Sequence, residues 1–86
     1  MNQDSSVMEV ITDAEEITPG TPDSVIVLVD AAAKFVGHTP HTMRQMRHLE
    51  QGPTSFLRSR RIAYRLGDLR SYNQARFNNS RRGGDY

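Results

Sequence analysis

Two segments of this 86-residue chain concentrate side chains that donate hydrogen bonds to anions and to base edges. The first, residues 39–48, carries arginine, histidine, threonine and glutamine, and the second, residues 55–65, carries four arginines. A guanidinium group is a planar donor fork that fits phosphate and the edge of guanine, and a glutamine amide can pair with adenine. This chemistry indicates a nucleic-acid partner, and we expect double-stranded DNA.

Position within each segment divides the candidate residues by role. The N-terminal part of a DNA-reading helix normally lies deepest in the major groove. The side chains expected at base edges are therefore His41, Thr42, Arg44 and Gln45. Those expected at phosphates further along the helix are Arg47 and His48. Arginines in the second segment would lie over the backbone or in the minor groove, whose negative potential attracts them. They are Arg58, Arg60 and Arg61, and the outward-pointing Arg65 completes the set.

The same residues have less specific interpretations. An arginine-bearing helix face is usually a solvated face, and these arginines could instead face an acidic protein partner. The three histidines, His38, His41 and His48, include no pair spaced four apart, and the chain has no cysteine, so we expect no zinc site. Neither a Ser-His-Asp grouping nor a glycine-rich phosphate loop suggests catalysis. We therefore expect neither an enzyme nor a bound cofactor.

Apolar spacing predicts the first element that positions these side chains. Val29, Ala32, Ala33 and Val36 recur at i, i+3, i+4 and i+7, which marks one face of a helix of about two turns. Gly37 suits the left-handed position that ends such a helix. The two small alanines would let another helix approach closely.

A second helix is predicted to begin almost at once. Thr39 is a favourable N-cap, and Pro40 fits the first helical position. Steps of about 100° place Met43, Met46 and Leu49 on one face, which we expect to be core. Only three residues separate the two apolar patterns, which is the turn length of a helix-turn-helix.

An arginine-rich hairpin is predicted after Gln51-Gly52-Pro53 ends the second helix. Its strands would be Ser55–Arg58 and Arg61–Arg65. The side chains expected to point inward are Ile62 and Tyr64, and those expected to point outward are Arg61, Ala63 and Arg65. The link Ser59-Arg60 lacks the glycine or asparagine that a two-residue turn prefers, so we expect a longer or looser tip.

Two further elements complete the expected fold. The β-branched run Val25–Val29 is predicted to be extended and could pair with the hairpin as a third strand. A last helix around Leu69 and Tyr72 would pack back on the core. These elements together predict a small α+β fold, a winged helix-turn-helix.

Charge is divided far more sharply than the net value of +1 suggests. Residues 1–30 carry seven acidic residues and no lysine or arginine, whereas residues 31–86 carry all eleven basic residues and three acids. An acidic leader on a basic body is typical of nucleic-acid binding. The sequence has no cysteine for a disulfide framework and no apolar run of about 18 residues for a membrane span, so we expect a cytoplasmic protein.

Composition also predicts the domain boundaries. The acidic part lacks aromatic residues and is interrupted by Thr18-Pro-Gly-Thr-Pro22, so we expect residues 1–25 to form a disordered leader. We hypothesise that this leader folds back on the basic body and competes with DNA. The DNA-binding domain would span residues 26–77, and residues 78–86 would be a flexible tail.

The order of these motifs resembles the excisionase-type, MerR-related winged helix-turn-helix family. The resemblance covers residues 27–74 and rests on a small-residue first helix ending at Gly37, Thr39-Pro-His-Thr-Met-Arg44, Gly52-Pro53, Arg60-Arg-Ile-Ala-Tyr-Arg65 and Asp68-Leu69. Family members typically show Ser/Thr-x-x-Thr-Leu-Arg, Gly-x-Pro and Arg-Arg-x-x-Tyr-Arg in this order. The chain departs from the pattern at Leu28, where the family prefers Thr or Ser, at Met46, which replaces an aromatic residue, and at the hairpin tip, which lacks glycine.

The resemblance implies both contacts and a function. The residues that match DNA-contacting positions of the family are Thr39, Thr42, Arg44, Gln45, Arg47, Arg58, Arg60 and Arg61. Excisionases, also called recombination directionality factors, are noncatalytic proteins that bind repeated sites in attachment DNA cooperatively and bend it. They direct an integrase towards excision of a phage or mobile element. The partners implied are attachment-site DNA, an integrase and further copies of the chain, in the cytoplasm of a bacterial host; the arginine bias would suit an actinobacterial phage. A small MerR-like transcriptional regulator of phage or mobile-element genes is the alternative.

Overall fold

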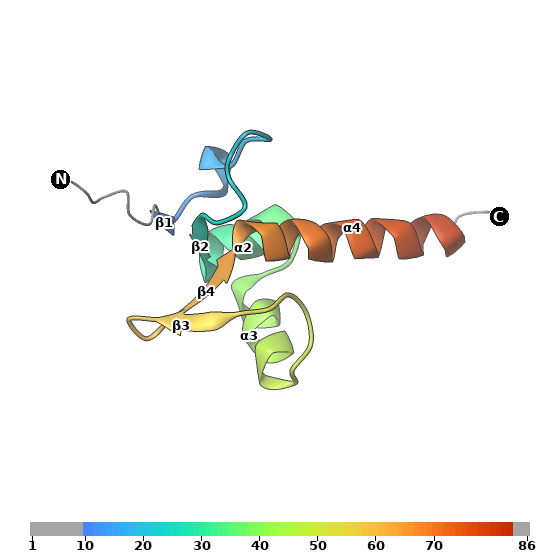
Figure 1. Cartoon of the computed structure of the whole chain (residues 1–86). Coiled ribbons are helices and arrows are strands. Elements are labelled where there is room, and N and C mark those ends of the chain that lie inside the picture. The colour runs from blue at the N-terminus through green and yellow to red at the C-terminus, as the bar shows by residue number, and fades with distance from the viewer. Residues whose placement is uncertain (1–9, 84–86) are drawn as a thin grey trace.

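The computed structural model describes residues 10–83, which form a four-stranded sheet, three α-helices and one short 3-10 helix (Figure 1). The elements in chain order are β1 Val10–Ile11, η1 Ala14–Glu16, β2 Ile26–Leu28, α2 Val29–Val36, α3 Pro40–His48, β3 Phe56–Arg58, β4 Arg61–Arg65 and α4 Leu66–Gly83. The strand order is β1-β2-β4-β3, with β1 parallel to β2 and the other two pairs antiparallel. The small α+β fold, the hairpin and its pairing with a third strand are confirmed.

One face of the sheet builds the core. Val27 of β2 pairs directly with Tyr64 of β4, and both side chains are buried against the helices. The largest fully buried side chains are Tyr64, Met43, Leu66, Leu69 and Val27. The small residues of α2 are also fully covered, as the close approach of another helix requires. Burial of this apolar surface is the main favourable contribution to folding.

The opposite face of the sheet is less open than the sequence predicts. Ala63 was expected to point outward from the core face, and its exposed fraction is 0%. In the register it lies between Leu28 of β2 and Phe56 of β3. These larger cross-strand neighbours on the same face shield its methyl group, which has no length with which to reach solvent. Ala63 therefore lies on the outward face of the sheet as predicted but is covered there, whereas Arg61 and Arg65 are exposed.

Local capping signals place α2 and α3 where the sequence predicts them. Gly37 ends α2 in the left-handed region, with φ of 83°. Thr39 caps α3, since its hydroxyl oxygen accepts a hydrogen bond from the backbone N–H of Thr42 at 3.1 Å. Pro40 occupies the first turn, where its missing N–H leaves no intrahelical bond unmade.

The end of α3 differs from the prediction. The helix stops at His48, before Gly52, and Glu50 then adopts a left-handed conformation with φ of 60°. The N–H of Gln51 bonds the carbonyl of Met46 at 2.7 Å, which closes the last turn. Leu49 sits at the C-cap of this reversal and is 61% exposed, so its assignment to the core is wrong.

Residues 10–25 are not a disordered leader. Ile11 of β1 pairs with Val27 in the sheet and is buried, and Asp13 caps η1 by accepting a hydrogen bond from the N–H of Glu15. Ile11 and Val25 belong to the core, and Ala14 and Ile17 pack against it, so four apolar residues attach this acidic segment. The disorder prediction is therefore wrong for residues 10–25, because average composition hid these well-placed apolar residues. The same prediction also covers residues 1–9, which lie outside the described part of the chain.

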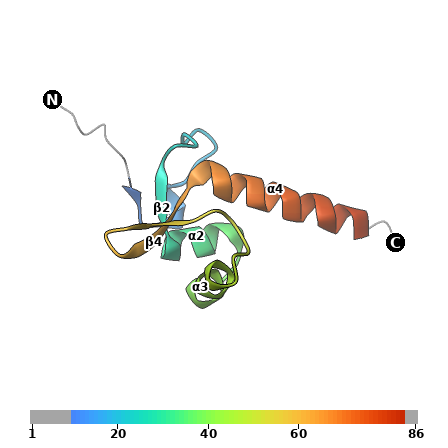
Figure 2. The ribbon, with the colours of Figure 1, turned by 60° about the horizontal axis from the view of Figure 1, so that its bottom comes forward.

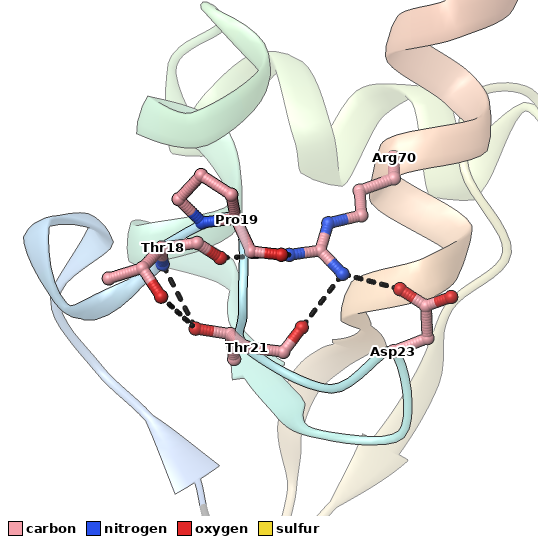
Figure 3. A network of polar contacts seen from close by, with 5 residues as sticks. All are labelled: Thr18, Pro19, Thr21, Asp23 and Arg70. Atoms are coloured by element: carbon pink, nitrogen blue, oxygen red, sulfur yellow. Dashed lines mark hydrogen bonds and ion pairs between the residues drawn. The ribbon is translucent and has the colours of Figure 1, made fainter.

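Arg70 of α4 holds the loop that precedes β2 (Figure 3). One guanidinium nitrogen donates to the carbonyl of Thr21 at 2.8 Å and pairs with the carboxylate of Asp23. The other donates to the carbonyl of Thr18 at 2.9 Å. Gly67 adds a backbone bond to Asp23, and a Cβ at this glycine would come within 2.9 Å of the Asp23 side chain. This loop and α3 lie on opposite sides of the body (Figures 1 and 2).

Helix α4 is longer than expected and projects from the body (Figures 1 and 2). It continues to Gly83, so residues 78–83 of the predicted tail are helical, while residues 84–86 lie outside the described part. Leu66 and Leu69 anchor the first turns of α4 in the core, and between Gly67 and Gly83 the sequence has no glycine or proline that would end the helix. Within residues 10–83, none of the helices combines the length and apolar character that crossing a bilayer requires.

Candidate nucleic-acid interface

Helix α3 turns one face to the core and the other to solvent. Met43 is 1% exposed and anchors the inner face. The exposed predicted residues of α3 are His41, Arg44, Gln45 and His48. They line, together with Leu49, a shallow hollow of about 260 Å³ on the outer face of the helix. Four of the residues expected to meet DNA are thus presented side by side.

Thr39 and Thr42 have a structural role in this arrangement. The two hydroxyl groups bond one another at 3.0 Å, and Thr39 also caps the helix. Both residues remain at the accessible N-terminal end of α3, with Thr39 exposed and Thr42 half-buried. Their hydroxyls fix the start of the helix, and hence the orientation of its exposed face.

Arg47 links α3 to the hairpin instead of extending freely. Its guanidinium donates to the hydroxyl oxygen of Ser55 at 2.6 Å, and its side chain is half-buried. Both residues line a hollow of about 750 Å³ between α3 and the start of the hairpin, along with Arg44, His48 and Ile62. Arg47 therefore positions the hairpin beside the helix while its charge remains in the hollow.

Arg44 connects the charges of the helix with those of the hairpin tip. Besides the hollow it shares with Arg47, it lines a second one of about 340 Å³ with Arg60 and Arg61. We call the surface formed by these four arginines and the two hollows between them the cationic face. Asp30, at the start of α2, lines the second hollow as well and is an acid among the cations.

The hairpin tip is a tight turn and not the longer tip that the sequence predicts. Arg58 and Arg61 are directly paired, so only Ser59 and Arg60 form the link. Both adopt positive φ, 51° and 71°, as a type I′ turn requires at its two central positions. Left-handed backbone costs a residue other than glycine about 1–2 kcal/mol. The rest of the fold tolerates this cost at a position that places a cationic side chain at the tip.

Arg65 is not brought to the cationic face. It lies at the opposite end of β4 from the tip, paired with Ile26, and its guanidinium stacks over the ring of Phe56 at 5.5 Å. Arg58 is exposed beside Arg61 at the tip, near the cationic face. Of the residues predicted to bind DNA, Arg65 is the one that the fold places elsewhere.

Tyr64 lies beneath the arginines of the cationic face. Burial raises the pKa of its hydroxyl, and the positive charges of Arg47 and Arg44 offset part of this rise. The phenol therefore stays neutral at physiological pH. It supports α3 through packing, while the nearby arginines keep their charge for an external partner.

His38 has a structural role that the sequence does not reveal. Its Nε2 lies 3.0 Å from the hydroxyl of Tyr72 in α4, and that hydroxyl also contacts the sulfur of Met46 at 3.5 Å. Burial lowers the pKa of the imidazole, and the charge of Arg76 lowers it further. A neutral His38 thus ties the α2–α3 turn to α4. In the part of the chain that the structure describes, no three potential metal ligands cluster.

Sequence reasoning missed Asp30 and Arg70 as well as His38. Each acts through a residue distant in the chain, and no local motif marks such a contact. Comparison with models of known protein families, with curated proteins and with solved structures gives no significant match for this chain.

Proposed function

We propose that the chain is a sequence-specific binder of duplex DNA, with a winged helix-turn-helix mode of docking. The observation that carries this proposal is the position of Arg44, which shares one hollow with Arg47 and a second with Arg60 and Arg61. A helix and a hairpin tip thereby present cations on one surface. Neutralisation of phosphates by such cations supplies much of the affinity of DNA-binding proteins.

The dimensions of α3 suit the major groove. An α-helix with its side chains is about 10–12 Å in diameter, and the groove is about 12 Å wide. In this mode Arg44 would bind guanine through two hydrogen bonds, and Gln45 would bind adenine. Arg60 at the tip would contact the backbone or the minor groove.

We further propose that this DNA binding serves excision of a phage or mobile element. The support is the resemblance of the motif order to excisionases, together with the small size of the domain. Bending a short site by 40–90° costs about 1–6 kcal/mol, which several copies bound side by side would share. Neighbouring copies and an integrase are therefore the expected partners on DNA.

Reconstituted recombination tests this function. Purified integrase, host bending factors and attL and attR substrates are combined with and without the protein, and excision products are counted. We expect excision to depend on the protein and to fail with an Arg44→Ala variant. DNA binding without any effect on attL × attR recombination would reject excision and favour the regulator alternative. No binding to any duplex at low salt would reject DNA binding itself.

A further inference from the structure

The outer face of α3 carries an apolar hollow in the middle of its polar residues. The hollow is lined by residues whose spacing forms one stripe along the helix: His41, Arg44, Gln45, His48 and Leu49. Most of the surface that these residues expose in the hollow belongs to their carbon atoms. Leu49 closes the C-terminal end of this stripe and is 61% exposed. A large aliphatic side chain is thus held in solvent beside hydrogen-bond donors.

We propose that Leu49 and this hollow read the 5-methyl group of thymine. The inference rests on the proposed DNA binding and adds a specificity-determining residue to it. In the major groove, a T·A pair differs from the other base pairs partly through this methyl group, and proteins contact it with apolar side chains. The hollow runs along the exposed face of α3 from His41 to Leu49, so it begins among the residues expected at base edges and ends at the C-cap.

Charge complementarity selects duplex DNA as the occupant of the hollow. Arg44 lines both this hollow and those of the cationic face, so a ligand seated here also meets positive charge. An apolar peptide would leave these guanidinium groups without a matching anion. Helical RNA would present phosphates, but its major groove is too deep and narrow for a helix, and uracil lacks the methyl group.

The fixed backbone around Leu49 supports a reading role. Leu49 donates its N–H to the carbonyl of Gln45 at 3.0 Å, and the following residues are tied to Met46 and Arg47 by backbone bonds. Its backbone is therefore held by a closed turn and not by a mobile loop end. A side chain on a fixed backbone loses less conformational freedom on binding than one on a mobile loop.

Replacement of thymine by deoxyuridine tests the proposal, because it removes the methyl group and keeps every base-pair hydrogen bond. The best duplex is first selected by the full chain from a randomised pool. Each thymine is then replaced in turn, and affinities for the thymine and deoxyuridine duplexes are measured by fluorescence anisotropy. We expect about a fourfold loss at one position, the value for one buried methyl-sized group. Leu49→Ala should bind both duplexes equally.

Leu57 provides a matched control. It is 60% exposed and lies on the hairpin, so Leu57→Ala removes the same carbon atoms from a different element. This variant should retain the fourfold ratio. The ratio is measured on one preparation with two duplexes, so it does not depend on the folded fraction of a variant.

Three results would overturn the proposal. They are a selected site without thymine, equal binding of both duplexes by the unaltered chain, and an undiminished ratio in Leu49→Ala. In each case the selected duplex is still bound, so the proposed function survives. Failure to select any duplex would instead remove the proposed function and the reading role together.

Discussion

Arg44 and Arg65 are both exposed arginines, but they belong to different surfaces. Arg44 lies at the centre of the cationic face, whereas Arg65 stacks on Phe56 at the far end of β4. We predict that Arg44→Ala weakens binding to the selected duplex by about 1–3 kcal/mol and relaxes preference at one base position. Arg65→Ala should leave the preference unchanged. Competition binding against single-base variants of the site measures both effects, and an equal loss for the two variants would refute the assignment of surfaces.

The lowered pKa of His38 predicts how the stability of the fold changes with pH. Its folded-state pKa lies below the ordinary value of 6.5, because of burial and then the charge of Arg76. The unfolded chain therefore takes up a proton that the folded chain resists, and stability is lost as the pH falls from about 6.5 towards the folded pKa. Above this window His38 is neutral in both states and contributes no pH dependence.

Urea unfolding at pH 8, 7 and 5.5 measures this effect. His38→Gln keeps a side chain able to bond the Tyr72 hydroxyl but cannot titrate, so we expect it to show a smaller loss of stability between pH 7 and 5.5. Glutamine variants of the exposed His41 and His48 serve as controls and should follow the unaltered chain. The same pH profile for His38→Gln and the unaltered chain would contradict the role of His38.

At the scale of elements, we expect substitutions in the hairpin turn to affect the stability of the fold and DNA binding in opposite directions. Ser59 and Arg60 both adopt left-handed backbone, which asparagine and glycine accept most readily. We predict that the double substitution Ser59→Asn, Arg60→Gly raises the free energy of unfolding by about 1 kcal/mol. The same variant should weaken binding to all duplexes and reduce the salt slope by about one unit, because one phosphate contact is lost.

Ser59→Asn alone is the control, since it relieves one strained position and keeps the arginine. It should be more stable than the unaltered chain and bind DNA equally well. Stability is measured by urea unfolding, and the salt slope by titration at several ionic strengths. A double variant less stable than the unaltered chain would contradict the turn geometry. An unchanged salt slope would show that Arg60 makes no phosphate contact.

The elements that the sequence predicts correctly are those with local signals. The small-residue stripe of α2, the positive φ of Gly37 and the Thr39-Pro40 cap each act within a few residues. The exposed face of α3 follows from the 3.6-residue periodicity of a helix, and the exposed arginines of β4 follow from the two-residue alternation of a strand. Leu49 also fits the helical periodicity, but the chain reverses at this residue and leaves it in solvent.

Elements that depend on distant contacts could not be predicted in this way. The loop of residues 18–23 is bonded to Arg70, which lies 49 residues beyond Thr21. The proximity of Asp30 to the hairpin tip, and the bond between Arg47 and Ser55, likewise exist only once the fold is formed. The average composition of residues 10–25 suggests disorder, whereas the hydrogen bonds of a single guanidinium group hold part of this segment in place.

At the scale of the whole molecule, the acidic loop held by Arg70 lies away from α3. The loop bound by Arg70 lies across the body from α3, so this loop does not cover the cationic face (Figures 1 and 2). Deleting residues 1–24 to test competition with DNA would also remove Ile11 from the core. A point substitution that frees the loop and keeps the apolar residues is a better test.

Arg70→Ala is that substitution. Arg70 is 30% exposed and donates to backbone carbonyls as well as to Asp23, which is 71% exposed. We predict a loss of about 1–3 kcal/mol in the free energy of unfolding, since each such hydrogen bond contributes about 0.5–1.5 kcal/mol. Asp23→Asn removes only the ion pair of an exposed carboxylate and should cost at most about 1 kcal/mol.

Hydrogen exchange locates the effect of Arg70→Ala in the molecule. We expect faster exchange in residues 10–25 and unchanged exchange in α3, because Arg70 bonds the loop and makes no hydrogen bond to α3. Affinity for DNA at moderate salt should then be unchanged. If the freed acidic segment weakens binding at low salt, the leader does compete with DNA, and Arg70 holds it away. Equal exchange of residues 10–25 in both proteins would show that Ile11 and Val25 hold the segment without Arg70.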